Sequence, residues 1–97
     1  EVENEINYGD GYMRDVRKLP RRTQEKLATL LVLMVRDAFD PLLHTKPLGK
    51  PLEGIYSIRI TRDWRVAFIF TASYTIKLLA ADDRGHIYQR LRRMLKK

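Results

Sequence analysis

Residues 57–70 read SIRITRDWRVAFIF, and this stretch decides the fold because it contains two expected β-strands separated by a tight turn. Apolar and polar residues alternate through both halves, as they do where one face of a sheet is buried. Arginines recur every third residue, at Arg59, Arg62 and Arg65. Arg62 belongs to the turn, whereas Arg59 and Arg65 fall on the same sheet face. The stretch therefore predicts a sheet that carries paired cations.

Three strands are expected around this stretch, over residues 55–61, 64–71 and 74–81. Their short links favour hairpin turns, so the economical topology is an antiparallel meander. The two strand arginines share one face with Lys77. The other face is strongly apolar and must be covered. Its predicted members are Tyr56, Ile58, Ile60, Trp64, Val66, Phe68, Phe70, Ile76, Leu78 and Ala80.

Two helices upstream are predicted to cover the apolar face. The first has Asp10 as its N-cap and ends before Pro20, because proline cannot continue a helix without losing a hydrogen bond. The second runs over residues 22–38, where apolar residues recur at helical spacing. Val32 and Leu33 lie off that apolar stripe. Either they press against a second surface of the same fold, or they contact a partner protein.

The remaining segments complete a single domain over residues 1–97. Residues 2–8 are predicted to form a first strand, and residues 39–54, punctuated by proline and glycine, an irregular loop. Residues 84–97 carry a narrow apolar stripe among basic residues, which predicts a short basic C-terminal helix. The expected fold class is α+β. Two N-terminal helices pack on an antiparallel sheet made of the N-terminal strand and the three-stranded meander.

Composition narrows the classes of function. The chain has 19 Lys and Arg against 12 Asp and Glu, a net charge of +7, which favours an anionic partner unless it serves only solubility. It has no cysteine, which excludes disulfides and thiolate metal sites and favours a cytoplasmic setting. The longest apolar run, residues 30–35, is too short to cross a bilayer, and no signal peptide is visible, so no membrane partner is expected. Because no Asp, Glu and His cluster has metal-ligand spacing, no metal or other cofactor is expected.

The paired strand arginines indicate a function rather than a contribution to folding. Like charges on neighbouring strands destabilise a sheet by up to about 1 kcal/mol. Phosphate is the natural counter-ion, since guanidinium groups bind its oxygens in bidentate fashion. The alternative is that Arg59 and Arg65 pair with surface carboxylates at Asp63, Asp82 or Asp83.

A second basic set lies in the C-terminal segment, where His86 and Tyr88 are interleaved with cations. An aromatic ring beside cations can stack on an unpaired base while the cations hold the phosphate backbone. The alternative is a solvated helix face. The cations are Arg84, Arg90, Arg92, Arg93, Lys96 and Lys97.

The sequence resembles the RelE/ParE superfamily of toxins from bacterial type II toxin–antitoxin systems, and its RelE-like branch in particular. The segment MRDVRKLPRRTQEKL (13–27) is similar to the family's first helix, its Leu-Pro break and the start of its second helix. KPLGKPLEGIYSIRI (46–60) is similar to the loop that leads into a strand ending in arginine. TRDWRVAFIF (61–70) and DRGHIYQRL (83–91) are similar to the next strand and the basic C-terminal segment. Together these segments cover nearly the whole chain.

The resemblance implies a metal-independent mRNA endoribonuclease that acts on the ribosome, inhibits translation and forms a hetero-oligomer with a cognate antitoxin. In that case Arg59 and Arg65 hold the scissile phosphate, His86 transfers a proton, and Tyr88 stacks on a base, orients the 2′-hydroxyl or acts as an acid or base. One departure is Ser57, where RelE has a strand lysine. The resemblance further implies RNA binding by Lys46, Lys50 and Arg84, and the cationic sheet face and the basic C-terminal segment add Lys77 and Arg90. The off-stripe positions of Val32 and Leu33 point to antitoxin binding.

Two other functions fit the same sequence. ParE-like members share the fold and inhibit DNA gyrase through surface contacts, without nuclease residues. A module that binds nucleic acid without cleaving it would also use the strand arginines. The set Arg59, Arg65, His86 and Tyr88 favours the nuclease.

Overall fold

Residues 57–70 contribute to two adjacent strands, β3 (Tyr56–Arg59) and β4 (Trp64–Ala72), in a computed structural model that describes residues 2–96. β5 (Thr75–Asp83) follows, and the three strands pair antiparallel as predicted. The sheet has five strands in the order β1-β5-β4-β3-β2, which places the arginine-bearing β4 at its centre. The predicted α+β class is confirmed.

The two outer strands differ from expectation. β1 (Glu5–Tyr8) pairs with β5 in parallel, so the sheet is mixed rather than fully antiparallel. β2 (Lys46–Pro47) is a two-residue strand paired with β3, inside the segment expected to be only a loop. Before it lies a short 3-10 helix, η1 (Pro41–Leu43).

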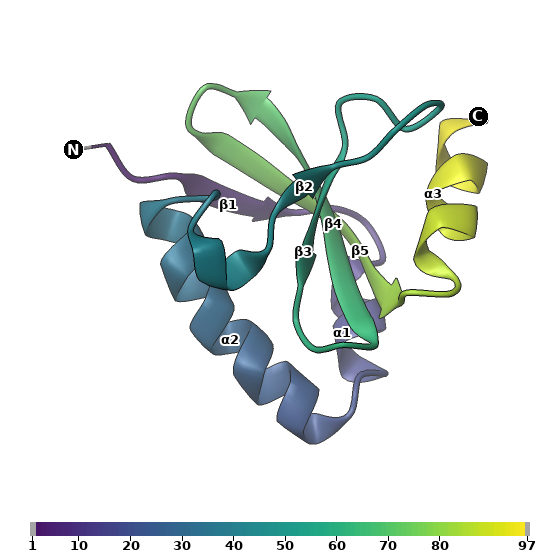
Figure 1. The fold of residues 1–97 in the computed structure, drawn as a ribbon, viewed down its shortest axis with the longest axis horizontal. Helices are drawn as coiled ribbons and strands as arrows, with labels where there is room; N and C mark the ends of the chain where they lie inside the picture. The colour runs from purple at the N-terminus through teal and green to yellow at the C-terminus, as the bar shows by residue number, and fades with distance from the viewer. Residues whose placement is uncertain (1, 97) are drawn as a thin grey trace.

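Helices α1 (Tyr12–Arg17) and α2 (Arg21–Arg36) cover one face of the sheet (Figure 1). The apolar stripe of α2 meets the predicted apolar strand residues there, and this contact buries the main hydrophobic core. Gly11, at φ 83°, precedes α1, and Asp10 makes no side-chain cap contact, so its predicted capping role was wrong. The largest fully buried core side chains include Tyr12, Met34, Phe68 and Leu78.

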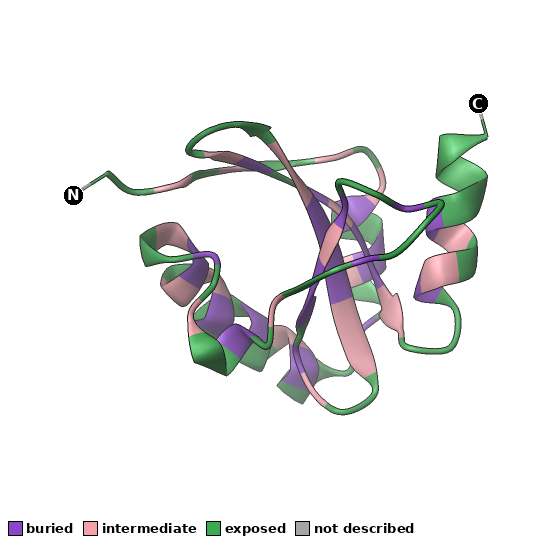
Figure 2. Cartoon of the chain, turned by 45° about the horizontal axis from the view of Figure 1, so that its top comes forward, coloured by how far each residue is buried: buried purple, intermediate pink, exposed green. Residues whose placement is uncertain are grey.

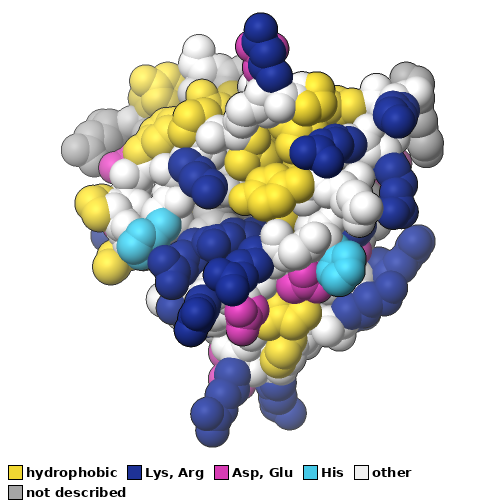
Figure 3. Space-filling model, turned by 45° about the vertical axis from the view of Figure 1, so that its right-hand side comes forward, with side chains coloured by type: hydrophobic (Ala, Val, Ile, Leu, Met, Phe, Trp, Pro, Cys, Tyr) yellow, Lys and Arg dark blue, Asp and Glu magenta, His cyan; other side chains and the backbone are white. Residues whose placement is uncertain are grey.

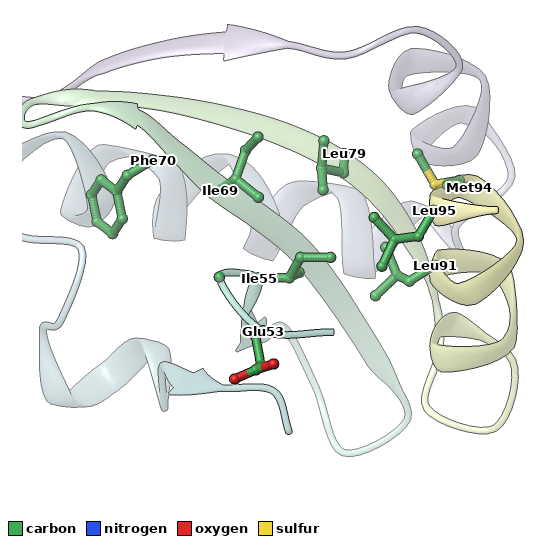
Figure 4. Close-up of a pocket in the computed structure, with 9 residues that line it drawn as sticks. Glu53, Ile55, Ile69, Phe70, Leu79, Leu91, Met94 and Leu95 are labelled. Atoms are coloured by element: carbon green, nitrogen blue, oxygen red, sulfur yellow. The ribbon is translucent and has the colours of Figure 1, made fainter. Parts of the chain in front are cut away.

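Helix α3 (Ile87–Leu95) packs on the opposite face, so the sheet lies between helices on both sides (Figures 1 and 2). The loop before β3 joins it there, and together they bury a second apolar cluster that the sequence analysis did not predict. Its buried members are Leu48, Leu52, Ile55, Ala67, Ala80, Ile87 and Leu91. An apolar groove of about 440 Å³ remains between the sheet and the end of α3, lined by Ile69, Leu79 and Met94 among others (Figure 4).

A bulge in β5 decides which residues face each helix layer. Phe68 pairs with Leu78 and Ala67 with Ala80, which leaves Leu79 without a partner in β4. Strict alternation predicts that Ala80 faces α1 and α2, and that prediction was wrong. The bulge turns Ala80 toward α3, while Ala81 joins the main core.

None of the helices in residues 2–96 combines the length and apolar character that crossing a membrane requires.

Candidate functional site

Arg59 and Arg65 are direct cross-strand partners on the β3–β4 ladder, on the sheet face that carries α3. Arg59 is exposed and Arg65 is half-buried. None of the four ion pairs formed within residues 2–96 involves either guanidinium, so the predicted alternative of pairing with Asp63, Asp82 or Asp83 is not what the structure has. Figure 3 shows Lys and Arg side chains gathered on this side of the molecule between two histidines. The sheet therefore presents two cations that have no carboxylate partner within the described chain.

The Nε atom of Arg65 is buried and lacks a hydrogen-bond partner among the described residues. An unsatisfied buried donor costs about 1–3 kcal/mol. An oxyanion bound beside β4 would offer this donor an acceptor.

Asp82 is the residue of β5 directly opposite Arg65. Its Oδ1 accepts the backbone N–H of Asp83 at 2.7 Å, and its Oδ2 accepts Nη1 of Arg90 at 3.1 Å. Both oxygens of this carboxylate are thus engaged away from the arginine pair. Arg59, Arg65 and Asp82 are successive cross-strand partners, and they form a row across one face of the sheet that leads to α3.

His86 lies at the end of that row, at the N-cap position of α3. Its Nδ1 lies 2.9 and 2.8 Å from the two carboxylate oxygens of Asp83, an arrangement in which Nδ1–H donates. The hydrogen bond to Asp83, together with the negative charge of that carboxylate, raises the pKa of His86 above 6.5. The imidazole is exposed, so its Nε2 edge can deliver a proton to a bound molecule.

The acidic pair and His86 also form the one cluster of possible metal ligands in the described chain. Ligand atoms of Asp82, Asp83 and His86 lie within 4.8 Å of one another. Each already has a protein partner: Asp83 holds His86, and Arg90 holds Asp82. The short distance between His86 and Asp82 also places the imidazole close to Arg65, because Asp82 is the cross-strand partner of Arg65.

Tyr88 lies in a separate, shallow depression of about 280 Å³ that it shares with the predicted Lys46 and Lys50. Arg92 of α3 completes this lining. Lys46, on β2, pairs with Ser57 of β3, which lies two residues before Arg59 on the same face, and long side chains reach across such diagonals. The depression is therefore adjacent to the arginine pair, and it joins a tyrosine to three cations.

Arg59 also lines a groove of about 470 Å³ between α2 and the end of β3. Two further cations, Lys26 and Arg62, and the exposed His44 share that lining. His44 lies in the loop over residues 39–54, and its spatial position rather than a sequence pattern marks it.

Two predicted RNA-binding residues lie outside this arrangement. Lys77 pairs with Ile69, four residues along β4 from Arg65, a separation of roughly 13 Å at 3.3 Å per residue. Arg90 is engaged inside the fold: its guanidinium contacts Asp15 at 3.0 Å and Asp82 at 3.1 Å. Burial disfavours the charged form of Arg90, but these hydrogen bonds outweigh that effect and raise its pKa overall.

The other predicted residues have mixed surroundings. Arg84 is exposed, and its backbone N–H donates to the carbonyl of Asp63 at 2.8 Å, which ties the end of β5 to the β3–β4 turn. Val32 is 60% exposed on α2. Leu33 packs against the main core and lines the groove beside Arg59, so its off-stripe position has a structural explanation.

Asp15 is the site residue that sequence reasoning missed. It is buried, accepts the backbone N–H of Ala81 at 3.1 Å, and pairs with Arg90. One signal was present: Asp15 falls between Tyr12 and Val16 on the apolar side of the first helix, where a carboxylate requires a partner.

Solved structures with the same architecture are toxins of toxin–antitoxin systems. YafQ from E. coli strain BL21(DE3) is 16% identical, with a TM-score of 0.73 over 89% of this chain and 99% of that chain. A YoeB/ParE toxin from Agrobacterium tumefaciens is 20% identical, with a TM-score of 0.71 over 82% and 98%. The toxin–antitoxin complex RelBE2 from Mycobacterium tuberculosis is 26% identical, with a TM-score of 0.60 over 86% and 100%.

The chain has the RelE/ParE-superfamily fold. Its resemblance to that superfamily is thereby confirmed at the level of architecture. Protein-family models and curated protein sequences give no match to the chain.

Proposed function

We propose that this protein is the toxin of a type II toxin–antitoxin system and that it cleaves mRNA on the ribosome without a metal ion. The observation that carries this proposal is the cross-strand pair of Arg59 and Arg65, which lacks carboxylate partners and lies beside a histidine held by Asp83. The RelE/ParE fold supports the same proposal, since the RelBE2 relative is a toxin–antitoxin complex.

The proposed reaction is internal transesterification of RNA. The ribose 2′-hydroxyl loses its proton to water as its oxygen forms a bond to the adjacent phosphorus, and the bond from phosphorus to the 5′-oxygen breaks, which leaves a cyclic phosphate. Arg59 and Arg65 neutralise the negative charge that develops on the phosphoryl oxygens. His86, held through Nδ1 by Asp83, donates the Nε2 proton to the departing 5′-oxygen.

The depression around Tyr88 has the chemistry of a single-stranded RNA contact. The tyrosine ring is half-buried among Lys46, Lys50 and Arg92, so we assign it to stacking on a base near the cleaved bond. The neighbouring cations then hold the backbone. Arg84, exposed at the end of β5, belongs to the same RNA-contacting surface in this proposal.

The cognate antitoxin is the proposed protein partner. Val32 supplies a large exposed apolar contact on the outer side of α2. We expect the antitoxin to bury Val32 in a toxin–antitoxin hetero-oligomer.

The experiment that tests the proposed function is mRNA end-mapping with translating ribosomes. Purified wild-type protein is expected to produce new mRNA 5′ ends, and Arg65→Ala is expected to produce none. Arg93→Ala, which removes an exposed cation of α3 outside the site, is the matched control and should cleave normally. Intact message together with blocked DNA supercoiling by gyrase would instead select the ParE-like function, and RNA binding without either effect would select a non-catalytic module.

A further inference from the structure

Arg65 and Asp82 occupy opposite positions on neighbouring strands, yet they form no ion pair. Oppositely charged residues placed this way ordinarily attract one another. If they paired here, the carboxylate would neutralise one of the two strand cations and repel any phosphate. Some feature of the fold therefore keeps Asp82 away from Arg65.

Besides the backbone N–H of Asp83, which binds Oδ1 of Asp82 at 2.7 Å, that feature is Arg90 of α3. Its Nη1 donates to Oδ2 of Asp82 at 3.1 Å and lies 3.4 Å from the carbonyl oxygen of Ala81. Its Nη2 lies 3.0 Å from Oδ2 of Asp15, a carboxylate whose side chain is only 8% exposed. Arg90 is thus anchored on its far side to α1, and from that anchor it draws Asp82 toward α3.

The contact between Arg90 and Asp15 is stable because the buried carboxylate of Asp15 needs a cationic partner. Asp15 Oδ2 also accepts the backbone N–H of Ala81, so helix α1, strand β5 and helix α3 meet at one buried carboxylate. Removing one member of a buried charged pair is strongly unfavourable, so Arg90 stays with Asp15 rather than turning outward to solvent.

We propose that Arg90 is a positioning residue that withholds Asp82 from Arg65 and so keeps the Arg59–Arg65 pair free to bind a phosphodiester. The identity of the anion rests on the proposed function above. This role replaces the direct RNA contact predicted for Arg90 from the sequence. Arg90 acts on the site by holding Asp82, which would otherwise compete with the phosphodiester for Arg65, and its own guanidinium does not contact the substrate.

The test uses variants built on Asp15→Asn, so that removing Arg90 leaves no buried unpaired carboxylate. Three proteins are compared: D15N, D15N with R90Q, and D15N with R90Q and D82N. The first readout is a crystal structure of each. The second is the affinity for a single-stranded RNA whose 2′-hydroxyls are methylated, which reports binding whether or not the protein is a nuclease.

In D15N with R90Q, we expect the Asp82 carboxylate to lie within hydrogen-bonding distance of Arg65, and RNA affinity to fall roughly fivefold or more relative to D15N. Adding D82N should restore the affinity of D15N, a rescue that a merely structural role of Arg90 would not produce. Asp82 remaining away from Arg65 would overturn the proposal, and so would a triple variant that binds as weakly as the double. Failure of the wild type to cleave mRNA, with this order of affinities intact, would reject the nuclease but not the role of Arg90.

Discussion

The Asp83 carboxylate holds Nδ1 of His86 at 2.8 Å across the turn between β5 and α3. The hydrogen bond to Asp83 and its negative charge raise the pKa of His86, and the hydrogen bond from His86 is the main cause that lowers the pKa of Asp83 from 3.8. Each residue therefore keeps the other charged over a wider range of pH.

The first prediction concerns the pH dependence of cleavage. As a proton donor, His86 acts while protonated, so activity should fall as pH rises through its pKa, with a midpoint above 6.5. Asp83→Asn should move that midpoint down toward 6.5. An NMR titration of the imidazole, alongside the pH–rate profile, measures both. An identical midpoint in wild type and variant would contradict the role of Asp83.

The same pair should contribute to stability in a defined pH window. Because the pKa of His86 is raised in the folded state, its contribution is complete below its unfolded pKa and disappears as pH rises through the folded value. Because the pKa of Asp83 is lowered, its contribution is complete above 3.8 and disappears as pH falls through the folded value. The difference in urea midpoint between wild type and Asp83→Asn should therefore be largest above the unfolded pKa of Asp83, 3.8, and below the unfolded pKa of His86, 6.5. A difference that is constant with pH would argue against the pair.

Arg59→Ala should lower activity without lowering stability. Loss of a phosphate-binding cation should lower the cleavage rate by about 10²-fold. Because Arg59 is exposed and faces another cation, its removal should leave the free energy of unfolding unchanged or raise it by up to about 1 kcal/mol. Chemical denaturation and end-mapping on the same preparation measure the two effects, with Arg36→Ala as an exposed control distant in sequence. A clear loss of stability would mean that Arg59 has a structural partner.

Asp15→Ala should destabilise the protein without touching the RNA surface. It removes the acceptor of the Ala81 N–H and one of the two carboxylates that hold Arg90. Since Arg90 is about one-third exposed and keeps Asp82, we expect a loss of about 2–4 kcal/mol, below the full penalty of an orphaned buried charge. Urea unfolding measures it. A loss below about 0.5 kcal/mol, the range of ordinary surface substitutions, would show that the network does not hold α3.

Val32→Asp should weaken binding of the antitoxin. The side chain is 60% exposed, so the fold has room for a carboxylate there, while a buried apolar contact in the complex does not. Calorimetry against the cognate antitoxin should give at least a tenfold loss, roughly 1.4 kcal/mol. Ala28→Asp places the same charge on an exposed position of α2 and serves as the control for helix integrity by circular dichroism. Equal affinity for the Val32 variant and wild type would remove this face of α2 from the interface.

The alternation in residues 57–70 was sufficient to predict β3, β4 and the Arg59–Arg65 pair, and alternation over residues 74–81 predicted β5. Long-range contacts were not predictable in this way. Pairing of β1 with β5 in parallel joins residues about seventy positions apart, and nothing local in Glu5–Tyr8 encodes its direction. The second apolar cluster was missed because Leu48 and Leu52 stand singly in a loop, where no periodicity marks them.

The candidate site was predicted only in part, because local patterns were visible in the sequence and long-range contacts were not. Arg59 and Arg65 share a local pattern, so the sequence placed them together. Arg90 looked like one more cation of a basic helix, because its principal partner, Asp15, lies seventy-five residues away in the sequence. Lys77 fell on the predicted face but far along it, since alternation specifies the side of a strand and not the position on it.

Leu79 has no partner in β4, so β5 contains one residue more than the β4 ladder needs at that point. Losing one residue from a strand normally exchanges inside for outside in everything beyond the gap. Because Leu79 is the unpaired residue of the bulge, deleting it would leave Ala81 facing the main core and Asp82 opposite Arg65. The bulge at Leu79 thus decides which face of the sheet Asp82 occupies. A related chain without the bulge and with one residue fewer would place its acidic residue opposite the arginine in the same way.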